Sequence, residues 1–416
     1  MEKRKKIIVV GGGFAGLHLA RRLNNEAFDI LLIDKQNHHQ FQPLYYQVAS
    51  ARLEPSNISF PFRKIFQKSK NIQFRLAEVT KIVDSENKIE TSIGDYHYDY
   101  LVIASGCKTN FFGNKEISKY ALSMKTTEEA IEIRNNILLS FEKIIWADEK
   151  DKEALLNIVL VGGGPTGVEL AGAFAEMRHH ILPRDYPQID FSNLKVILLE
   201  GSKHTLNSMS EESKLASRKY LEELGVLVKT ETIVTNYDGK TATLNNGETI
   251  PTSNLIWAAG VIGNIIEGLP TESIIKNRYK VDRYNKILGT QNIYAIGDIA
   301  YMETPLYPNG HPQLANVAIN QGKNLASNFL KLLKVKELKE YEYKDLGSMA
   351  TIGKRRAVVD LPFVKFQGFF AWFVWMFLHL MLILSVRNKI IIFFNWAWSY
   401  LTKDSSLRLI LKPKKN

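Results

Sequence analysis

Two glycine-rich loops, 151 residues apart, constrain the fold of this chain more than any other feature of its sequence. The first loop, 11–16, follows an apolar run at 7–10, and the second, 162–167, follows an apolar run at 158–161. Each has the spacing GxGxxG and opens a helical pattern. In such a loop the glycines allow a tight turn, a close approach of the backbone to a pyrophosphate and the packing of helix on strand, and the helix N-terminus stabilises the diphosphate charge. Two such loops predict two bound dinucleotides, which suggests electron transfer between them.

An acidic residue ends the second strand pattern after each loop. Asp34 lies 18 residues after Gly16, and Glu200 lies 33 residues after Gly167, so we expect an insertion in the second unit at about 179–193. A carboxylate at this position accepts hydrogen bonds from ribose hydroxyls and repels a 2′-phosphate, so both sites are expected to prefer a non-phosphorylated ribose. The alternatives are that the two acids are solvated loop carboxylates, and that the nearby Lys203 leaves room for a 2′-phosphate.

The length and composition predict a globular protein of two or three domains. The chain has 416 residues, of which 45% are hydrophobic. Its single cysteine, Cys107, excludes a disulfide framework and a CxxC redox centre. The charged segment 1–6 runs directly into the first strand pattern, so no secretory signal is expected.

The C-terminal segment combines long apolar runs with basic charge. The chain carries a net charge of +11, and residues 387–416 hold seven basic residues against one acid. The run 369–386 reaches the 18-residue length of a membrane-spanning helix, although His379 interrupts it, whereas the run 390–401 is too short to span and contains tryptophans, which prefer the interface. We therefore expect a monotopic anchor on anionic lipid, with a true span or a buried or dimer-forming helix as alternatives. Nucleic acid is not expected, because its common binding motifs are missing from the sequence.

Further short apolar runs place more buried parallel strands along the chain. They occur at 100–103, 255–258 and 293–296, and Asp298 follows the last of them, at the carboxyl end where doubly wound sheets bind ligands. The predicted fold class is α/β, with two Rossmann-like dinucleotide-binding domains, the second inserted in the first, and a C-terminal membrane-anchoring helical module. The predicted boundaries are 1–115 with 285–345 for the first domain, 116–284 for the second and 346–416 for the C-terminal module.

The electron acceptor can be narrowed by elimination. A flavin and a nicotinamide would carry out hydride transfer themselves, with the protein holding and orienting their rings. Disulfide reductases and cysteine peroxidases need cysteine in the helix after the first acid, and this stretch has none. Cys107 instead follows the turn 104–106 and is interpreted as structural. A diffusible acceptor remains, and a membrane-seeking tail favours a lipid-soluble quinone.

The chain resembles the type II NADH:quinone oxidoreductases, which are single-subunit respiratory NADH dehydrogenases that do not pump protons. The resemblance extends over nearly the whole chain. Besides the glycine loops it rests on the segments 41–49, 256–261, 295–298 and 347–353, and on the tail Trp375…His379-Leu380…Arg387-Asn388-Lys389. It implies noncovalent FAD in the first domain, NADH as substrate in the second, and a quinone pocket under the flavin that faces the membrane.

The resemblance also implies roles for individual residues. The first loop would hold the FAD diphosphate, Asp34 the adenosine ribose and Asp298 the ribityl–phosphate region, whereas the second loop and Glu200 would hold NADH. The complete set of implied cofactor-binding residues is Gly11, Gly13, Phe14, Ala15, Gly16, Asp34, Lys35, Ala104, Ser105, Gly106, Asp298, Leu314 and Ala315 for FAD, and Gly162, Gly164, Pro165, Thr166, Gly167, Glu200, Ala259 and Gly260 for NADH. No metal site is expected.

Glu169 matches a family glutamate near the nicotinamide and the quinone, which implies a catalytic, proton-transferring role. Reduction of a quinone consumes two protons, whereas a flavin delivers a hydride. The alternative is that Glu169 is only an acid in the first turn of a helix, where the helix dipole stabilises its charge.

One segment departs from the family pattern. The quinone-site helix of the family usually reads Ala-Gln-x-Ala-x-Gln-Gln-Gly, whereas residues 315–322 read Ala-Asn-Val-Ala-Ile-Asn-Gln-Gly. Asn316 and Asn320 therefore replace two glutamines on one helix face, and Gln321 is retained. The amide chemistry is preserved but its reach is one methylene shorter, which bears on quinone affinity or quinone type.

The leading hypothesis is an FAD-dependent NADH:quinone oxidoreductase bound peripherally to the cytoplasmic face of the cell membrane, with a second copy of the chain, in a homodimer, as a candidate partner. The first alternative is an NADH oxidase or diaphorase with a soluble acceptor, whose tail serves dimerisation. The second is a non-catalytic, NAD-binding redox sensor.

Overall fold

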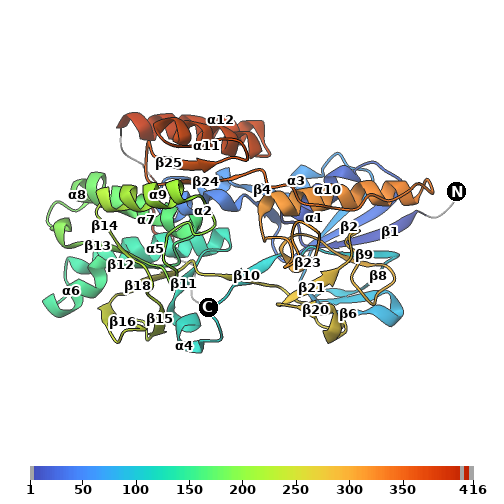
Figure 1. Cartoon of the computed structure of the whole chain (residues 1–416), viewed down its shortest axis with the longest axis horizontal. Helices are drawn as coiled ribbons and strands as arrows, with labels where there is room; N and C mark the ends of the chain where they lie inside the picture. Colours follow the sequence, from blue (N-terminus) through green and yellow to red (C-terminus); the bar gives the residue numbers. More distant parts are fainter. Residues whose placement is uncertain (1–3, 403–406, 412–416) are drawn as a thin grey trace. The chain divides into compact units, whose positions relative to one another are not determined.

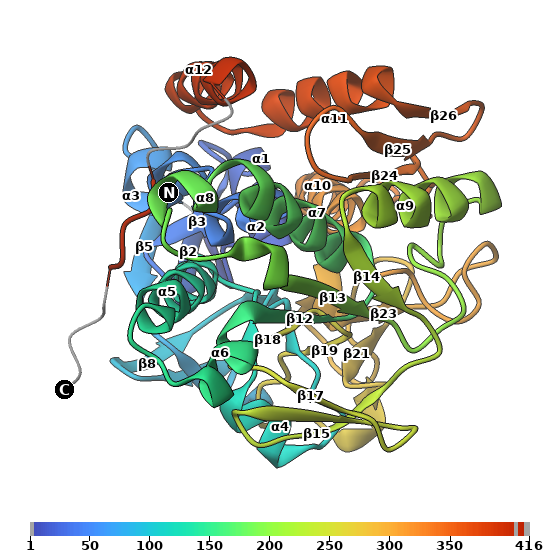
Figure 2. The ribbon, with the colours of Figure 1, turned by 90° about the vertical axis from the view of Figure 1, so that its left-hand side faces the viewer.

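The computed structural model describes residues 4–402 and 407–411, which form two compact units (Figures 1 and 2). Of the described residues, unit 1 comprises 4–40, 60–108 and 261–345, and unit 2 comprises 41–59, 109–260, 346–402 and 407–411. Part of the predicted basic segment lies outside the described residues, namely Lys403, Asp404, Lys412, Lys414 and Lys415.

Unit 1 is built on a five-stranded parallel sheet with the order β22-β9-β1-β2-β5. Its strands are β1 (Lys5–Val10), β2 (Phe28–Asp34), β5 (Ile72–Leu76), β9 (Tyr100–Ile103) and β22 (Ile293–Ala295). The central strand β1 forms because Ile7–Val10 are all buried apolar side chains. Helix α1 (Phe14–Arg22) follows the first glycine loop and packs against α10 (Ala315–Leu332).

Smaller sheets complete unit 1 and extend its core. One is the antiparallel meander β6 (Val79–Val83), β7 (Lys88–Thr91) and β8 (Gly94–His97), and another is β20 (Ile274–Ile275), β21 (Arg278–Val281) and β23 (Ala300–Met302). The short strand β3 (His38–Gln40) pairs with β4 (Ser59–Pro61), which the helix α3 (Phe62–Ile65) follows directly. The core joins the first sheet to these strands through buried residues such as Tyr279 and Ile293.

Unit 2 repeats the same strand arrangement. Its parallel sheet has the order β11-β18-β12-β13-β14, so the strand before each glycine loop, β1 or β12, occupies the same central place. The strands are β11 (Leu122–Ser123), β12 (Asn157–Val161), β13 (Lys195–Leu199), β14 (Val226–Lys229) and β18 (Asn254–Trp257). The α/β fold with two dinucleotide-type sheets, predicted from the duplicated loops, is confirmed.

The helices of unit 2 explain the longer interval between its loop and its acid. Helix α7 (Pro165–His180) has 16 residues, whereas its counterpart α1 has nine. The short helices α8 (Leu182–Asp185) and η4 (Phe191–Asn193) follow before β13. Part of the extra length therefore lies in the helix itself, and part in the segment where the sequence predicted an insertion.

Other elements of unit 2 surround its sheet. They are α2 (Tyr45–Ala49), α4 (Lys115–Tyr120), α5 (Thr127–Ile144), α6 (Glu149–Leu156), α9 (Glu211–Glu223) and the antiparallel sheet of β15 (Val234–Tyr237), β16 (Thr241–Leu244) and β17 (Thr249–Pro251). Helix α5 begins with a capping box, in which Thr126 and Glu129 bond to each other's backbone N–H groups. Helix α2 packs against both α5 and α7.

The C-terminal part of unit 2 is a small sheet followed by two helices. The strands β24 (Ser348–Thr351), β25 (Ala357–Asp360) and β26 (Lys365–Gly368) form an antiparallel sheet, which the prediction of a purely helical module missed. Helix α11 (Phe369–Leu382) packs on β25 and β26, and α12 (Val386–Thr402) lies beside it (Figures 1 and 2).

The predicted apolar runs of this segment are divided differently from the expectation. Helix α11 ends before Ile383, so the 18-residue run 369–386 is not one helix. Its first 14 residues form α11, and its last residue, Val386, begins α12. Helix α12 begins at Val386, four residues before the apolar run 390–401, and in its first turn Arg387 is exposed whereas Asn388 is buried. None of the helices within residues 4–402 and 407–411 is both long and apolar enough to cross a membrane.

Both C-terminal helices expose an apolar face. On α11 the exposed side chains are Phe369, Phe370, Phe373, Phe377, Leu378, Met381 and Leu382, and on α12 they are Val386, Ile390, Phe393, Phe394, Trp398 and Leu401. They recur every three or four residues and so follow one side of each helix. A continuous exposed apolar patch of this kind marks an interaction surface.

Candidate functional site

Both glycine loops have the geometry that a dinucleotide loop requires. Gly11 has φ +101° and a Cβ there would lie 2.3 Å from the carbonyl oxygen of Ala104, and Gly162 has φ +108° in the corresponding position. By contrast, a Cβ on Gly13 or Gly164 would meet nothing within 4 Å. Gly11 and Gly162 therefore fix the turn of their loops. Gly13 and Gly164 leave open space in which a ligand can approach the backbone.

The acid after each loop is bonded to that loop. Asp34 Oδ2 accepts from Gly12 N at 2.6 Å and its Oδ1 accepts from Gln36 N at 2.7 Å. Glu200 accepts from Gly163 N in the same way, and its Oε1 accepts from Ser202 N at 2.7 Å. Each carboxylate thus orders the loop, which the sequence argument, based on ribose alone, had not predicted.

These bonds do not cancel the cost of burying Asp34. Desolvation raises the pKa of Asp34, whereas its two backbone hydrogen bonds act in the opposite direction. Its neighbour Lys35, the other predicted residue at this strand end, is exposed to solvent.

The remaining predicted FAD residues lie at the carboxyl ends of β9 and β22 in unit 1. Ser105 Oγ donates to Asn264 O at 2.7 Å, which fixes the turn 104–106. Cys107 Sγ donates to Asp298 Oδ2 at 2.9 Å, so the single cysteine of the chain contacts the acid that follows β22. Gln313 Nε2 donates to the carbonyl oxygen of Asp298 at 3.0 Å.

The α10 residues that depart from the family pattern follow in the same unit. Leu314 precedes the helix, Ala315 is its first residue, and Asn316 and Asn320 are both partly exposed. Gln321 is fully buried, and its Oε1 accepts from Gly297 N at 2.7 Å. The amide oxygen of Gln321 is therefore engaged in holding the turn that carries Asp298.

Glu169 lies in the second turn of α7, not in the first as the sequence suggested, because the helix begins at Pro165. It is 9% exposed, and its carboxyl group accepts a long hydrogen bond, from Thr351 N to Oε1 at 3.4 Å. Burial raises the pKa of Glu169 to about 8, and this weak bond lowers it only in part. At neutral pH the group is a carboxylic acid that can donate a proton.

A chain of hydrogen bonds connects the strand beside Glu169 with α12. Tyr46 Oη lies 3.2 Å from Thr351 Oγ1, Gln47 Nε2 donates to Tyr46 Oη at 3.0 Å, and Trp396 Nε1 donates to Gln47 Oε1 at 2.8 Å. From the sequence, Trp396 was expected at the membrane interface, and no individual role was predicted for Tyr46, Gln47 or Thr351. The segments 41–49 and 347–353 were only among those that carried the resemblance.

A buried ion pair lies on α7, two turns after Glu169. Arg52 Nη2 contacts Glu176 Oε2, and their side chains are 12% and 9% exposed. Glu176 Oε1 also accepts from the backbone N–H of Lys354. Helix α7 is therefore joined to the end of β24 through Glu169 and to the segment after β24 through Glu176.

The predicted NADH residues lie together in unit 2. Pro165 is the first residue of α7, where its missing N–H is tolerated, and Thr166 follows it. Gly260 has φ +76° in the turn after β18, beside Ala259. The structure thus groups every predicted FAD and quinone residue in unit 1, and every predicted NADH residue, with Glu169, in unit 2.

Comparisons with known proteins agree with this arrangement. The family model of the pyridine nucleotide-disulphide oxidoreductases matches residues 5–322, and that of the NDH2 C-terminal domain matches residues 346–403. The type II NADH:quinone oxidoreductases NdhA and Ndh of Mycobacterium tuberculosis are 33% and 31% identical to this chain, over 96% of it and 87% and 89% of their own lengths. In fold the chain is similar to NDH2 of Plasmodium falciparum, solved with NADH, with a TM-score of 0.90, 22% identity and coverage of 99% and 100%. The chain therefore belongs to the type II NADH:quinone oxidoreductases, within the pyridine nucleotide-disulphide oxidoreductase family.

Proposed function

We propose that this chain oxidises NADH and passes the electrons through FAD to a membrane quinone, without pumping protons, while lying on the cytoplasmic face of the membrane. The observation that carries the proposal is the repeated dinucleotide unit, because each copy has its own open loop and its own loop-bound acid. FAD is the cofactor of this family and NADH its electron donor. The chain is an enzyme, an oxidoreductase of the NADH dehydrogenase type.

Unit 1 fits FAD. The open space at Gly13 is a cradle that a Cβ would fill, and the N-terminus of α1 faces the same loop, as a diphosphate requires. Gly11, Gly16 and the turn 104–106 would shape this site, and Asp34 and Asp298 would contact the ribose and the ribityl–phosphate region. When bound, FAD supplies the hydride chemistry between nicotinamide and quinone.

Unit 2 would hold NADH by the equivalent groups. The loop from Gly162 to Gly167 would contact the diphosphate at the start of α7. Glu200 would contact the adenosine ribose and keep a 2′-phosphate away, because its carboxylate is already fixed to Gly163 and Ser202 and cannot turn aside.

Glu169 would supply a proton during quinone reduction. Conversion of a quinone to a quinol adds two electrons and two protons, and a buried acid with a pKa near 8 is protonated at neutral pH. Asn316 and Asn320 would contact the quinone with shorter amides than the family glutamines. For Gln321 the bond to Gly297 supports a role in positioning rather than in direct quinone contact.

The C-terminal helices would anchor the chain in the membrane interface. Their exposed apolar faces, which are rich in phenylalanine and include Trp398, provide apolar area for insertion to a shallow depth.

One experiment tests the proposed reaction. Purified full-length protein is given NADH and a short-chain quinone, with and without oxygen, while flavin absorbance is recorded. We expect bound flavin and rapid quinone-dependent loss of NADH in both gas phases. Loss of NADH only with oxygen would instead indicate an NADH oxidase, and protein that carries no flavin after expression and reconstitution would contradict the proposal.

A further inference from the structure

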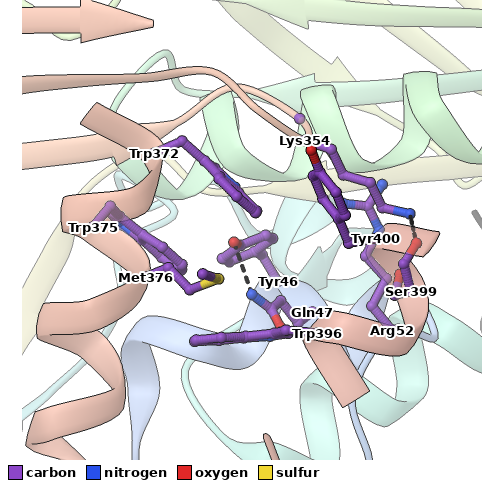
Figure 3. Close-up of a pocket in the computed structure, with 11 residues that line it drawn as sticks. Tyr46, Gln47, Arg52, Lys354, Trp372, Trp375, Met376, Trp396, Ser399 and Tyr400 are labelled. Atoms are coloured by element: carbon purple, nitrogen blue, oxygen red, sulfur yellow. Dashed lines mark hydrogen bonds between the residues drawn. The ribbon is translucent and has the colours of Figure 1, made fainter. Parts of the chain in front are cut away.

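A small cavity in unit 2 lies where the C-terminal helices meet the segments 46–52 and 353–354 (Figure 3). Its walls are aromatic, with Trp372 and Trp375 from α11 and Trp396 and Tyr400 from α12. Two basic side chains, Arg52 and Lys354, line it, and no acidic residue does. Glu176 pairs with Arg52 from outside the lining, so the cavity and this partner together carry one net positive charge, beside helices whose outer faces are apolar.

Arg52 has donors available to a ligand. Among the residues that the structure describes, the hydrogen bonds of its guanidinium both start from Nη2, one to Glu176 and the other to Ala173 O at 3.1 Å. Nε and Nη1 remain, and each can donate a charge-assisted hydrogen bond to an acceptor such as a phosphate oxygen. The ion pair with Glu176 holds Arg52 in place.

Lys354 is held at the same cavity by α12. Its Nζ donates to Ser399 O at 2.9 Å, and Figure 3 shows this bond beside the ring of Tyr400. Next along the chain, the guanidinium of Arg355 lies 4.6 Å from the centre of the Tyr400 ring, which also stacks on Trp372. Two cations are thus fixed at the cavity, and a third lies on one of its aromatic walls.

The size of the cavity limits its occupant. Its volume is about 50 Å³, which suits a few water molecules or one phosphate-sized group. Pockets for drug-sized organic ligands measure roughly 300–1,000 Å³. A whole quinone is therefore too large, whereas a small anion fits both the volume and the charge.

We propose that this cavity binds the phosphate group of an anionic membrane phospholipid, with Arg52 and Lys354 as its ligands. The inference depends on the proposed membrane attachment of α11 and α12. It adds to that attachment a selective contact with one class of lipid, because the apolar faces alone would hold any bilayer. Trp372, Trp396 and Tyr400 would surround the headgroup at the depth where such side chains are favoured.

The test compares anionic lipids with and without phosphate. Full-length, FAD-loaded protein is sedimented with vesicles of digalactosyl diacylglycerol, a neutral lipid without phosphate. One set of vesicles also contains phosphatidylglycerol and the other contains oleate, in amounts that give both sets the same zeta potential. We expect the partition coefficient of the wild-type protein to be about fivefold higher with phosphatidylglycerol. Equal partitioning into both vesicles would overturn the proposal.

Two variants locate the effect in the cavity. Lys354→Gln should remove most of the preference for phosphatidylglycerol, and Arg52→Lys should reduce it while the charge opposite Glu176 is kept. Lys389→Gln is the matched control, because Lys389 Nζ also donates to a helix carbonyl, Met381 O at 2.9 Å, but does not line the cavity. An equal loss of preference in Lys389→Gln would show diffuse attraction instead of a site.

Activity in detergent separates this proposal from the reaction. All three variants should oxidise NADH with a short-chain quinone as the wild type does. A raised quinone KM in Lys354→Gln with an unchanged lipid preference would assign the cavity to the quinone and overturn the phospholipid site. An inactive wild type that still distinguishes the two vesicles would contradict the proposed function alone.

Discussion

The backbone N–H of Thr351 reaches Glu169 Oε1 across 3.4 Å, and this long bond leaves a buried carboxyl group with little stabilisation of its charge. Because Thr351 Oγ1 also contacts Tyr46 Oη, the same residue connects Glu169 to α2. Glu169 therefore remains protonated near neutral pH.

Replacing this acid should slow only the second half of the reaction. Glu169→Gln keeps the shape of the side chain and removes its ionisable proton. We expect quinone-dependent oxidation of the flavin to fall by at least about tenfold, because a positioned proton donor contributes roughly 100- to 10,000-fold. Stopped-flow absorbance measures the step, and flavin reduction by NADH in the same samples is the internal control. If the variant reduced quinone at the wild-type rate, Glu169 would have no proton role.

The pH dependence of stability should report the same group. The pKa of Glu169 is raised from 4.5 to about 8, so the folded state binds the proton more tightly than the unfolded state. The resulting stabilisation is complete below pH 4.5 and is lost as the pH rises through about 8. In thermal unfolding experiments, the melting temperature of Glu169→Gln should fall less between pH 6 and pH 9 than that of the wild type. Parallel pH profiles for the two proteins would indicate that Glu169 titrates near its usual pKa.

Nucleotide choice should depend on Glu200. We expect kcat/KM for NADH to exceed that for NADPH by about tenfold or more, equivalent to about 1.4 kcal/mol. Glu200→Gln should narrow this ratio, because an amide does not repel a 2′-phosphate yet can still accept from the N–H of Gly163 or Ser202. Steady-state kinetics with both nucleotides tests this, and equal values for the wild type would contradict it.

Membrane attachment should depend on the exposed faces of α11 and α12. Trp398 is 67% exposed on α12, whereas Trp146 is 75% exposed in the loop after α5. We expect Trp398→Ser combined with Phe377→Ser to lower partitioning into vesicles several-fold, and Trp146→Ser to leave it unchanged. High salt alone should not release the wild type, because apolar burial outweighs the basic charge. Complete release by salt would show an electrostatic anchor instead.

The parts of the fold that local sequence patterns determine were predictable. A glycine loop, the strand before it and the acid after it lie within a few dozen residues. The sequence alone therefore placed Gly11 beside Asp34, and Gly162 beside Glu200. The boundaries at 115, 284 and 345 and the roles of the individual site residues stay predictions.

Contacts between distant segments were not predictable in this way. Tyr46 and Thr351 are 305 positions apart, and Gln47 and Trp396 are 349 apart. No periodicity in one strand or helix indicates such partners, because their meeting depends on how α2, β24 and α12 pack. For the same reason the sequence placed Glu169 on a helix but could not show that it was buried with one weak bond.

The two asparagines of α10 offer the sharpest test of the quinone site. Asn316 and Asn320 are partly exposed on one face of the helix, whereas Gln321 is buried and bonded to Gly297. Restoring the longer family amides, as Asn316→Gln with Asn320→Gln, should shift the apparent quinone KM by several-fold and leave flavin reduction by NADH nearly unchanged. Gln321→Leu is the contrasting variant, because it removes the acceptor for Gly297 N and should weaken FAD retention through the turn that carries Asp298. Stopped-flow kinetics and FAD release on dilution separate the two effects, and asparagine variants that alter NADH oxidation as much as quinone reduction would refute the assignment of this face to the quinone.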